Sequence, residues 1–139
     1  MEFLVTWLVS LILFMVVPFK SIPNEITPYY NEFIEIVQKE CPKAKPPMQF
    51  GIYFKKLKNE EVGLCTLYTF KSKIEIDEFF WATSDNRTRR QLVFHELTHC
   101  ILETHHVEDI QNYMYPYMVY VPEEQLAGQV KQVAKDYCN

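Results

Sequence analysis

The four histidines of the chain all lie between His95 and His106. Residues 95–99 read His-Glu-Leu-Thr-His, so His95 and His99 are four positions apart. On a helix such side chains lie one above the other, and both imidazoles can bind one metal ion at about 2.0–2.1 Å. Glu96, beside them, can take a proton from a zinc-activated water and return it to a leaving amine. The motif therefore predicts a catalytic Zn2+ site with Glu96 as general base.

A catalytic zinc ion needs a third protein ligand and one open coordination position. His105 and His106 are the nearest candidates. If the helix continued straight, His106 would lie about 10 Å beyond His99 along the helix axis, too far to share an ion. The helix must therefore break after about Leu102 and the chain must turn back. A break of this kind usually uses glycine, and this segment contains none.

The segment HELTHCILETHHVEDIQNYMYPYM, residues 95–118, resembles the metzincin zinc peptidases, most closely their matrixin-like branch. The metzincin pattern is H-E-x-x-H-x-x-G-x-x-H, followed by a methionine turn. In this strict spacing His105 is the third ligand and Leu102 replaces the glycine. Thr98 also departs from the glycine that is usual at its position.

The residues downstream fit the resemblance better when they are counted from His106. Matrixins typically carry Asp-Ile and then Met-Tyr-Pro after the third histidine, and here these are Asp109-Ile110 and Met114-Tyr115-Pro116. The resemblance therefore favours His95, His99 and His106 as the zinc ligands, with one extra residue between the second and the third.

The resemblance implies a zinc-dependent endopeptidase, a hydrolase that cleaves peptide bonds in a peptide or protein substrate. Met114, Tyr115 and Pro116 would form the methionine turn, with Met114 as a hydrophobic floor under the metal. Residues 115–120 would form the wall of the pocket for the residue that follows the cleaved bond. The strand over 74–81 would bind extended substrate as an additional strand.

Two other schemes use the same motif. In a gluzincin-type peptidase a glutamate on the following helix is the third ligand, and Glu124, in Glu124-x-x-Ala127, is the candidate. In a non-catalytic, membrane-tethered zinc-binding module the metal would have four protein ligands. Cys100 is the nearest further donor, but helical geometry turns it about 100–140° away from the histidines.

The elements around the motif indicate an α+β fold. Apolar spacing and capping residues predict helices from Thr27 to Cys41, from Ser84 or Asp85 through the motif, and from near Pro122 to Tyr137. Residues 48–57, 62–70 and 74–81 are predicted strands, the first two able to pair as a hairpin and the third, charged on one face, typical of an edge. We expect a minimal metzincin-like zincin domain with a small mixed sheet, an active-site helix and a C-terminal helix.

The N-terminal run over residues 3–17, FLVTWLVSLILFMVV, contains no charge. It is close to the roughly 20 apolar residues that cross a bilayer. The sequence therefore predicts a signal anchor or signal peptide over 1–20, a linker over 21–28 and a zinc metallopeptidase domain over 29–139. Residues 3–19 would contact the membrane, and the protein would be membrane-anchored or exported to the cell envelope or extracellular side. A buried N-terminal helix is the alternative.

Composition limits the remaining possibilities. The 139 residues carry a formal net charge of −4, which argues against nucleic acid as a partner. The 3 glycines form no nucleotide-binding motif. The four cysteines, at 41, 65, 100 and 138, permit two disulfides in three pairings, or four reduced thiols. Cys41 and Cys138 each end a predicted helix, which makes a bond between them possible.

Overall fold

The structure, a computed structural model, describes residues 19–139. These residues form a mixed α+β fold with four helices and one four-stranded sheet, which confirms the predicted fold class. The elements in chain order are β1 (Phe19–Ser21), α2 (Thr27–Glu40), β2 (Gln49–Lys55), β3 (Gly63–Leu67), β4 (Lys71–Asp77), α3 (Glu78–Thr83), α4 (Asn86–Ile101) and α5 (Glu123–Cys138).

The sheet has the strand order β1-β2-β4-β3. β1, β2 and β4 are mutually parallel, whereas β3 is antiparallel to β4 and forms one edge of the sheet. The predicted hairpin between 48–57 and 62–70 is therefore wrong, because β4 lies between these two strands. The prediction that 74–81 is an edge strand is wrong as well.

Two sets of interactions explain why β4 is an inner strand of the sheet and why it ends at Asp77. Glu75, on its charged face, is neutralised by Lys55 at 3.1 Å and Lys73 at 3.4 Å, so this charge does not require an edge. Asp77 then caps α3 by accepting a hydrogen bond from the Phe80 backbone N–H at 3.0 Å. Residues 78–83, predicted as the end of a strand, are for this reason helical.

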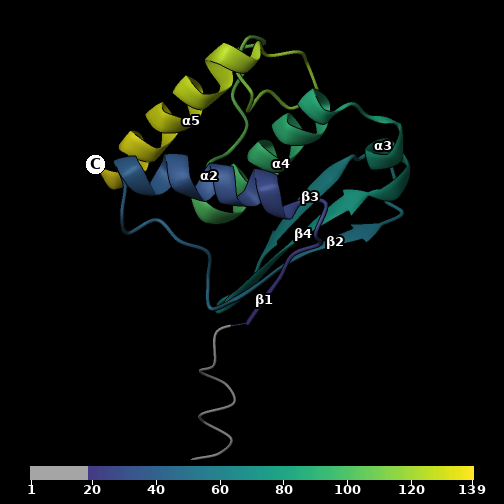
Figure 1. Ribbon diagram of the computed structural model, residues 1–139, viewed down its shortest axis with the longest axis horizontal. Helices are drawn as coiled ribbons and strands as arrows, with labels where there is room; N and C mark the ends of the chain where they lie inside the picture. Colours follow the sequence, from purple (N-terminus) through teal and green to yellow (C-terminus); the bar gives the residue numbers. More distant parts are fainter. Residues whose placement is uncertain (1–18) are drawn as a thin grey trace, which may run out of the picture.

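The helices α2 and α4 lie over one face of the sheet, and α5 runs along α2 (Figure 1). The apolar side chains of α2 and α4 meet in the core, where the rings of Phe33 and Phe94 are 5.5 Å apart in an edge-to-face arrangement. A disulfide between Cys41 and Cys138 joins the ends of α2 and α5, with the two Cα atoms 5.7 Å apart. The sequence left this bond possible, and the alternative of four reduced thiols is wrong, because none of the cysteines is free.

The expected membrane anchor falls mainly on residues 1–18, outside the described part of the chain. Phe19 and Lys20, the last residues of the predicted leader, belong to β1. The predicted linker over 21–28 connects β1 with α2 and contributes its last two residues to α2. Within residues 19–139, no helix combines the length and the apolar character that crossing a membrane requires.

Candidate metal centre

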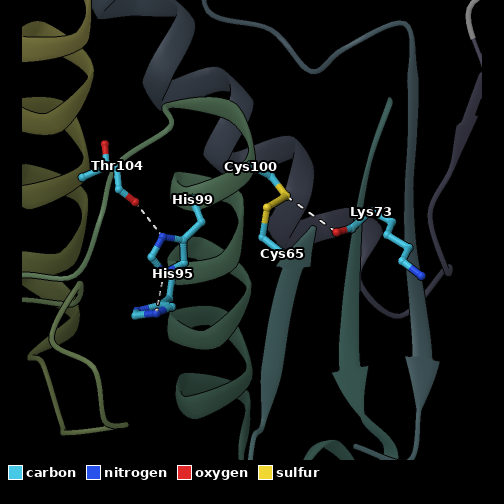
Figure 2. Close-up of a disulfide and its surroundings, with 6 residues drawn as sticks. All are labelled: Cys65, Lys73, His95, His99, Cys100 and Thr104. Carbon is cyan, nitrogen blue, oxygen red and sulfur yellow. Dashed lines mark hydrogen bonds between the residues drawn. A yellow bond between two sulfur atoms is a disulfide. The ribbon is translucent and has the colours of Figure 1, made fainter. Parts of the chain in front are cut away.

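The motif lies on α4, which is the central helix of the fold. Of the two predicted caps, Ser84 and Asp85, the structure has the second: the Asp85 carboxylate accepts a hydrogen bond from the Thr88 backbone N–H at 2.8 Å. Its middle, residues 91–98, is buried on every side. His95 and His99 project from one side of α4, and Cys100 projects from the other, toward β3 (Figure 2). The prediction that Cys100 is turned away from the two histidines is therefore confirmed.

Three histidines converge at this side of α4. The Nε2 atom of His95 lies 3.2 Å from the Nε2 atoms of both His99 and His106. Among residues 19–139, this is the one group of three or more His, Cys, Asp or Glu side chains whose ligand atoms lie within 4.8 Å of one another. The third histidine of the cluster is thus His106, the residue favoured by the methionine-turn spacing.

Backbone carbonyls hold two of these rings in one orientation. His95 Nδ1 lies 2.7 Å from the carbonyl oxygen of Tyr113, and His99 Nδ1 lies 2.6 Å from that of Thr104. A carbonyl can only accept, so each neutral ring carries its hydrogen on Nδ1 and leaves the Nε2 lone pair free. Figure 2 shows the His99 and Thr104 pair.

The donor set fits a divalent metal ion. Unprotonated Nε2 atoms of His95 and His99 that face each other cannot hydrogen-bond, and their lone pairs repel unless a cation lies between them. In a tetrahedral zinc site, nitrogens at 2.0–2.1 Å from the ion are about 3.4 Å apart, close to the observed 3.2 Å. The site therefore suits an ion bound by imidazole, although the spacing does not identify the metal.

Burial keeps these rings neutral. Desolvation, together with the neighbouring His99 and His106 rings, lowers the pKa of His95 to about 4, although the bond to the Tyr113 carbonyl acts to raise it. Desolvation also lowers the pKa of His99. Since a metal binds the neutral imidazole, protons compete only weakly for this site at neutral pH.

The helix ends without glycine. Leu102 is the C-cap, and Glu103 has the left-handed backbone angle φ of 49°. Glu103, and not Leu102 as expected from the strict metzincin spacing, makes the turn that a glycine would make. It precedes His106 by three residues, as the glycine precedes the third histidine in the metzincin pattern. The left-handed conformation costs a non-glycine residue roughly 1–2 kcal/mol.

The two alternative ligands lie elsewhere. His105 borders the cleft described below but does not belong to the cluster of three histidines. Glu124 is exposed in the first turn of α5 and is outside this cluster too. Cys100 forms a disulfide with Cys65 of β3, with Cα atoms 5.8 Å apart, so it cannot be a fourth ligand (Figure 2).

The Glu96 side chain projects from α4 and is buried against the edge strand β3. A Cβ atom added to Gly63 would lie 2.7 Å from Glu96 Oε1, so the missing side chain of Gly63 makes room for the carboxylate. Desolvation, together with the charge of Glu61, raises the pKa of Glu96 to about 8. The Cys65 backbone N–H opposes this shift, because it interacts with the ionised carboxylate.

An open cleft of about 720 Å³ runs past Glu96 and the histidines. β3 and the turn before it form one side, and the segments after α4 form the other. Pro116 borders this cleft, whereas Met114 is completely buried next to Tyr113, which binds His95. Residues 114–116, the predicted methionine turn, thus follow directly on a residue that contacts α4 at His95, and the role of Met114 as floor stays a prediction.

Sequence reasoning missed two supports of the site: Gly63, and the carbonyls of Tyr113 and Thr104. Gly63 carried a weak signal, being one of only 3 glycines in the chain. A backbone carbonyl leaves no signal in the sequence, because every residue has one.

Comparison with known proteins places the chain in no family. No protein-family model matches it, and searches of curated proteins and of solved structures find no significant similarity. A function must therefore be argued from the chemistry of the site itself.

Proposed function

We propose that the protein is a zinc-dependent endopeptidase of the metzincin type, most similar to matrixins. The observation that carries this proposal is the meeting of three imidazole Nε2 atoms beside a buried carboxylate in an open cleft. Three histidine ligands leave one position of a tetrahedral ion free, which is the mark of a catalytic zinc site.

His95, His99 and His106 would hold the ion, and zinc bound there would supply an activated water and polarise the carbonyl of the scissile bond. The carbonyls of Tyr113 and Thr104 hold the first two rings in place. Such partners typically contribute 10–100-fold to metal affinity or activity.

Glu96 would act as general base and then as general acid. Its pKa of about 8 suits a group that takes a proton from water and gives it to the leaving amine near neutral pH. Gly63 and the Cys65 backbone N–H hold the carboxylate at the edge of the sheet, where a substrate peptide can reach it.

β3, rather than 74–81, would bind the substrate. The Val62 carbonyl accepts from Asp77 N–H at 2.9 Å, and the Tyr68 N–H donates to the Lys71 carbonyl at 2.8 Å. Backbone groups alternate in direction along a strand, so those of Gly63, Cys65 and Leu67 point away from β4. The Cys65 N–H is engaged by Glu96, and an extended peptide can add along the remaining backbone groups of this edge as a fifth strand.

The alternatives have less support. A gluzincin-type peptidase needs Glu124 at the metal, and a closed structural site needs a fourth protein ligand, for which Cys100 is not free. The peptidase would be membrane-anchored or exported, since two disulfides are typical of an oxidising compartment and residues 3–19 suit a membrane. Peptides or proteins, and not nucleic acids, would be its partners.

The full chain, loaded with zinc in detergent micelles, tests the proposal on a broad peptide library. We expect cleavage that a chelator abolishes, zinc restores and Glu96→Gln lowers by at least about 1,000-fold. Glu124→Gln is the matched control and should keep both activity and zinc. Absence of cleavage by the folded, zinc-loaded protein, or equal activity of Glu96→Gln, would overturn it.

A further inference from the structure

One end of the sheet carries an exposed apolar cluster. Because β1, β2 and β4 are parallel, their first residues lie side by side: Phe19 pairs with Gln49, and Gln49 pairs with Lys71. The antiparallel β3 ends there as well, since Leu67 pairs with Ser72. Figure 1 shows this end at the bottom of the sheet, where the described chain begins. We call it the strand-start end.

The apolar side chains at the strand-start end are unusually exposed. Phe70 is 77 % exposed, and four more large apolar residues are at least 43 % exposed. They are Phe19, Met48, Leu67 and Tyr68. A hydrogen bond of 2.7 Å from Phe19 N–H to the Met48 carbonyl, and the bond between Tyr68 and Lys71, tie their backbones together. Such a cluster of exposed apolar side chains marks an interaction surface.

The same end is basic. Three segments build it, residues 19–23, 45–49 and 67–71, and they contain three lysines and no aspartate or glutamate. Since the whole chain carries −4, the remainder carries −4 minus 3, or −7. The Lys71 ammonium group lies 5.3 Å from the centre of the Tyr68 ring, so charge and aromatic surface are interleaved. The strand-start end is thus a positive patch on an acidic protein.

The position of this patch along the chain identifies its partner. Phe19 follows almost directly on the uncharged run over residues 3–17. Aromatic and lysine side chains next to an apolar segment are characteristic of the interface between a bilayer and water. From this juxtaposition we propose that the strand-start end docks on an anionic membrane surface, with Phe70, Tyr68 and Met48 in the headgroup layer and the lysines against lipid phosphates.

Docking would also orient the cleft. Leu67 belongs both to the strand-start end and to the cleft wall, so one end of the cleft opens beside the bilayer. On the proposed peptidase function, on which this consequence rests, the substrates are extended segments that lie close to a membrane. The docking itself does not depend on that activity.

Two phenylalanines at opposite ends of β4 allow a matched test. Phe70 precedes β4 and Phe79 follows it, and both are 77 % exposed. The chain has two tryptophans, of which Trp81 is buried and Trp7 lies in the apolar run. Full chains with Trp7→Phe and either Phe70→Trp or Phe79→Trp are incorporated into vesicles of phosphatidylcholine and phosphatidylglycerol with brominated acyl chains, which quench nearby tryptophan.

We expect the Phe70→Trp emission to fall at least about twofold, since interfacial side chains lie roughly 5–10 Å into the headgroup and acyl boundary. The Phe79→Trp emission should stay nearly unchanged, and neutral vesicles or high salt should weaken the quenching of Phe70→Trp. Equal quenching at both positions, or none at Phe70→Trp, overturns the proposal. The proposal is also overturned if the Phe70→Trp emission shifts to the blue without quenching and this shift grows with the protein-to-lipid ratio. That result would mean that the patch binds a second copy of the chain. Peptidase activity does not enter this measurement.

Discussion

The imidazole of His95 donates its Nδ1 hydrogen to the carbonyl oxygen of Tyr113, at a distance of 2.7 Å. The Tyr113 hydroxyl meets the Thr98 hydroxyl one helical turn further along α4, also at 2.7 Å. Tyr113, directly before the predicted methionine turn, thus contacts α4 at two levels, with its backbone at His95 and its side chain at Thr98 in the core. Because Tyr113 is attached to α4 at two points, both the position of its segment along the helix and the rotation of that segment against the helix are defined.

Removing this hydroxyl pair should have unequal effects on stability. Thr98→Val leaves the buried Tyr113 hydroxyl without its partner, which costs about 1–3 kcal/mol of unfolding free energy. Tyr113→Phe leaves Thr98 its 2.7 Å bond to the Phe94 carbonyl, and costs about 0.5–1.5 kcal/mol. Urea unfolding of both variants and of the double variant measures this. Strictly additive losses would show that the two hydroxyls do not interact.

The choice between the two adjacent histidines can be tested by metal binding. His106→Ala removes a ligand atom and should weaken zinc binding by more than about 100-fold. This exceeds the usual effect of removing a group that only hydrogen-bonds to a ligand. His105→Ala, one residue away and outside the cluster, should bind zinc like the unaltered chain. Competition with a chromophoric chelator gives both affinities. The reverse order would assign the third ligand to His105.

Gly63 should be required for activity but not for the metal. In Gly63→Ala the new Cβ would lie 2.7 Å from Glu96 Oε1 and would displace the carboxylate from the edge strand. We expect at least about a 100-fold loss of peptide cleavage, typical of a lost general base, with one zinc ion retained per chain.

Gly128 provides the control for this experiment. It lies in α5, and a Cβ added there meets no atom within 4 Å. Gly128→Ala should therefore raise the unfolding free energy by about 0.5–1 kcal/mol and leave cleavage unchanged. If both alanine variants kept full activity, the close approach of Gly63 to Glu96 would have no catalytic meaning.

The turn after α4 should be strained in a way that glycine relieves. Glu103 has φ of 49°, so Glu103→Gly should stabilise the protein by about 1 kcal/mol. Glu103→Ala removes the carboxylate but keeps the left-handed conformation, and should bring no such gain. Thermal unfolding at constant zinc concentration compares the two, and a gain from alanine equal to that from glycine would point to charge rather than backbone strain.

The zinc-free protein should lose stability with rising pH because of Glu96. Burial raises the pKa of this carboxyl from 4.5 to about 8, so between these values the folded state holds a proton that the unfolded state has released. The free energy of unfolding then falls as pH rises, by up to about 1.4 kcal/mol per pH unit, and levels off above pH 8.

Glu96→Gln isolates this effect. His95, with its pKa lowered to about 4, acts in the opposite direction below pH 6.5, so the unaltered chain alone shows a mixture of both. The stability advantage of Glu96→Gln should grow from pH 4.5 to pH 8, the range between the two Glu96 pKa values, in urea unfolding of the metal-free proteins. An advantage that does not depend on pH would contradict the buried, protonated carboxyl.

The sequence by itself determined the features that depend on neighbours along the chain. The side of α4 that carries His95 and His99 and the opposite direction of Cys100 follow from helical geometry, and the structure agrees. Capping preference limited the start of the helix to Ser84 or Asp85, and the structure has Asp85. The spacing of the methionine turn even indicated His106. The relationships within α4 span a few residues, so the rise and rotation of one helix are enough to predict them, whereas His106 was favoured only by the resemblance to metzincins.

The tertiary structure alone decided the order of the strands and the supports of the site. Glu75 suggested an edge strand because its partners Lys55 and Lys73 could not be known before the strands were paired. Gly63 and Glu96 are far apart in the sequence, and their approach depends on β3 lying against α4. Contacts of this kind depend on how whole elements pack, and local preference and periodicity carry no information about which distant residues that packing brings together.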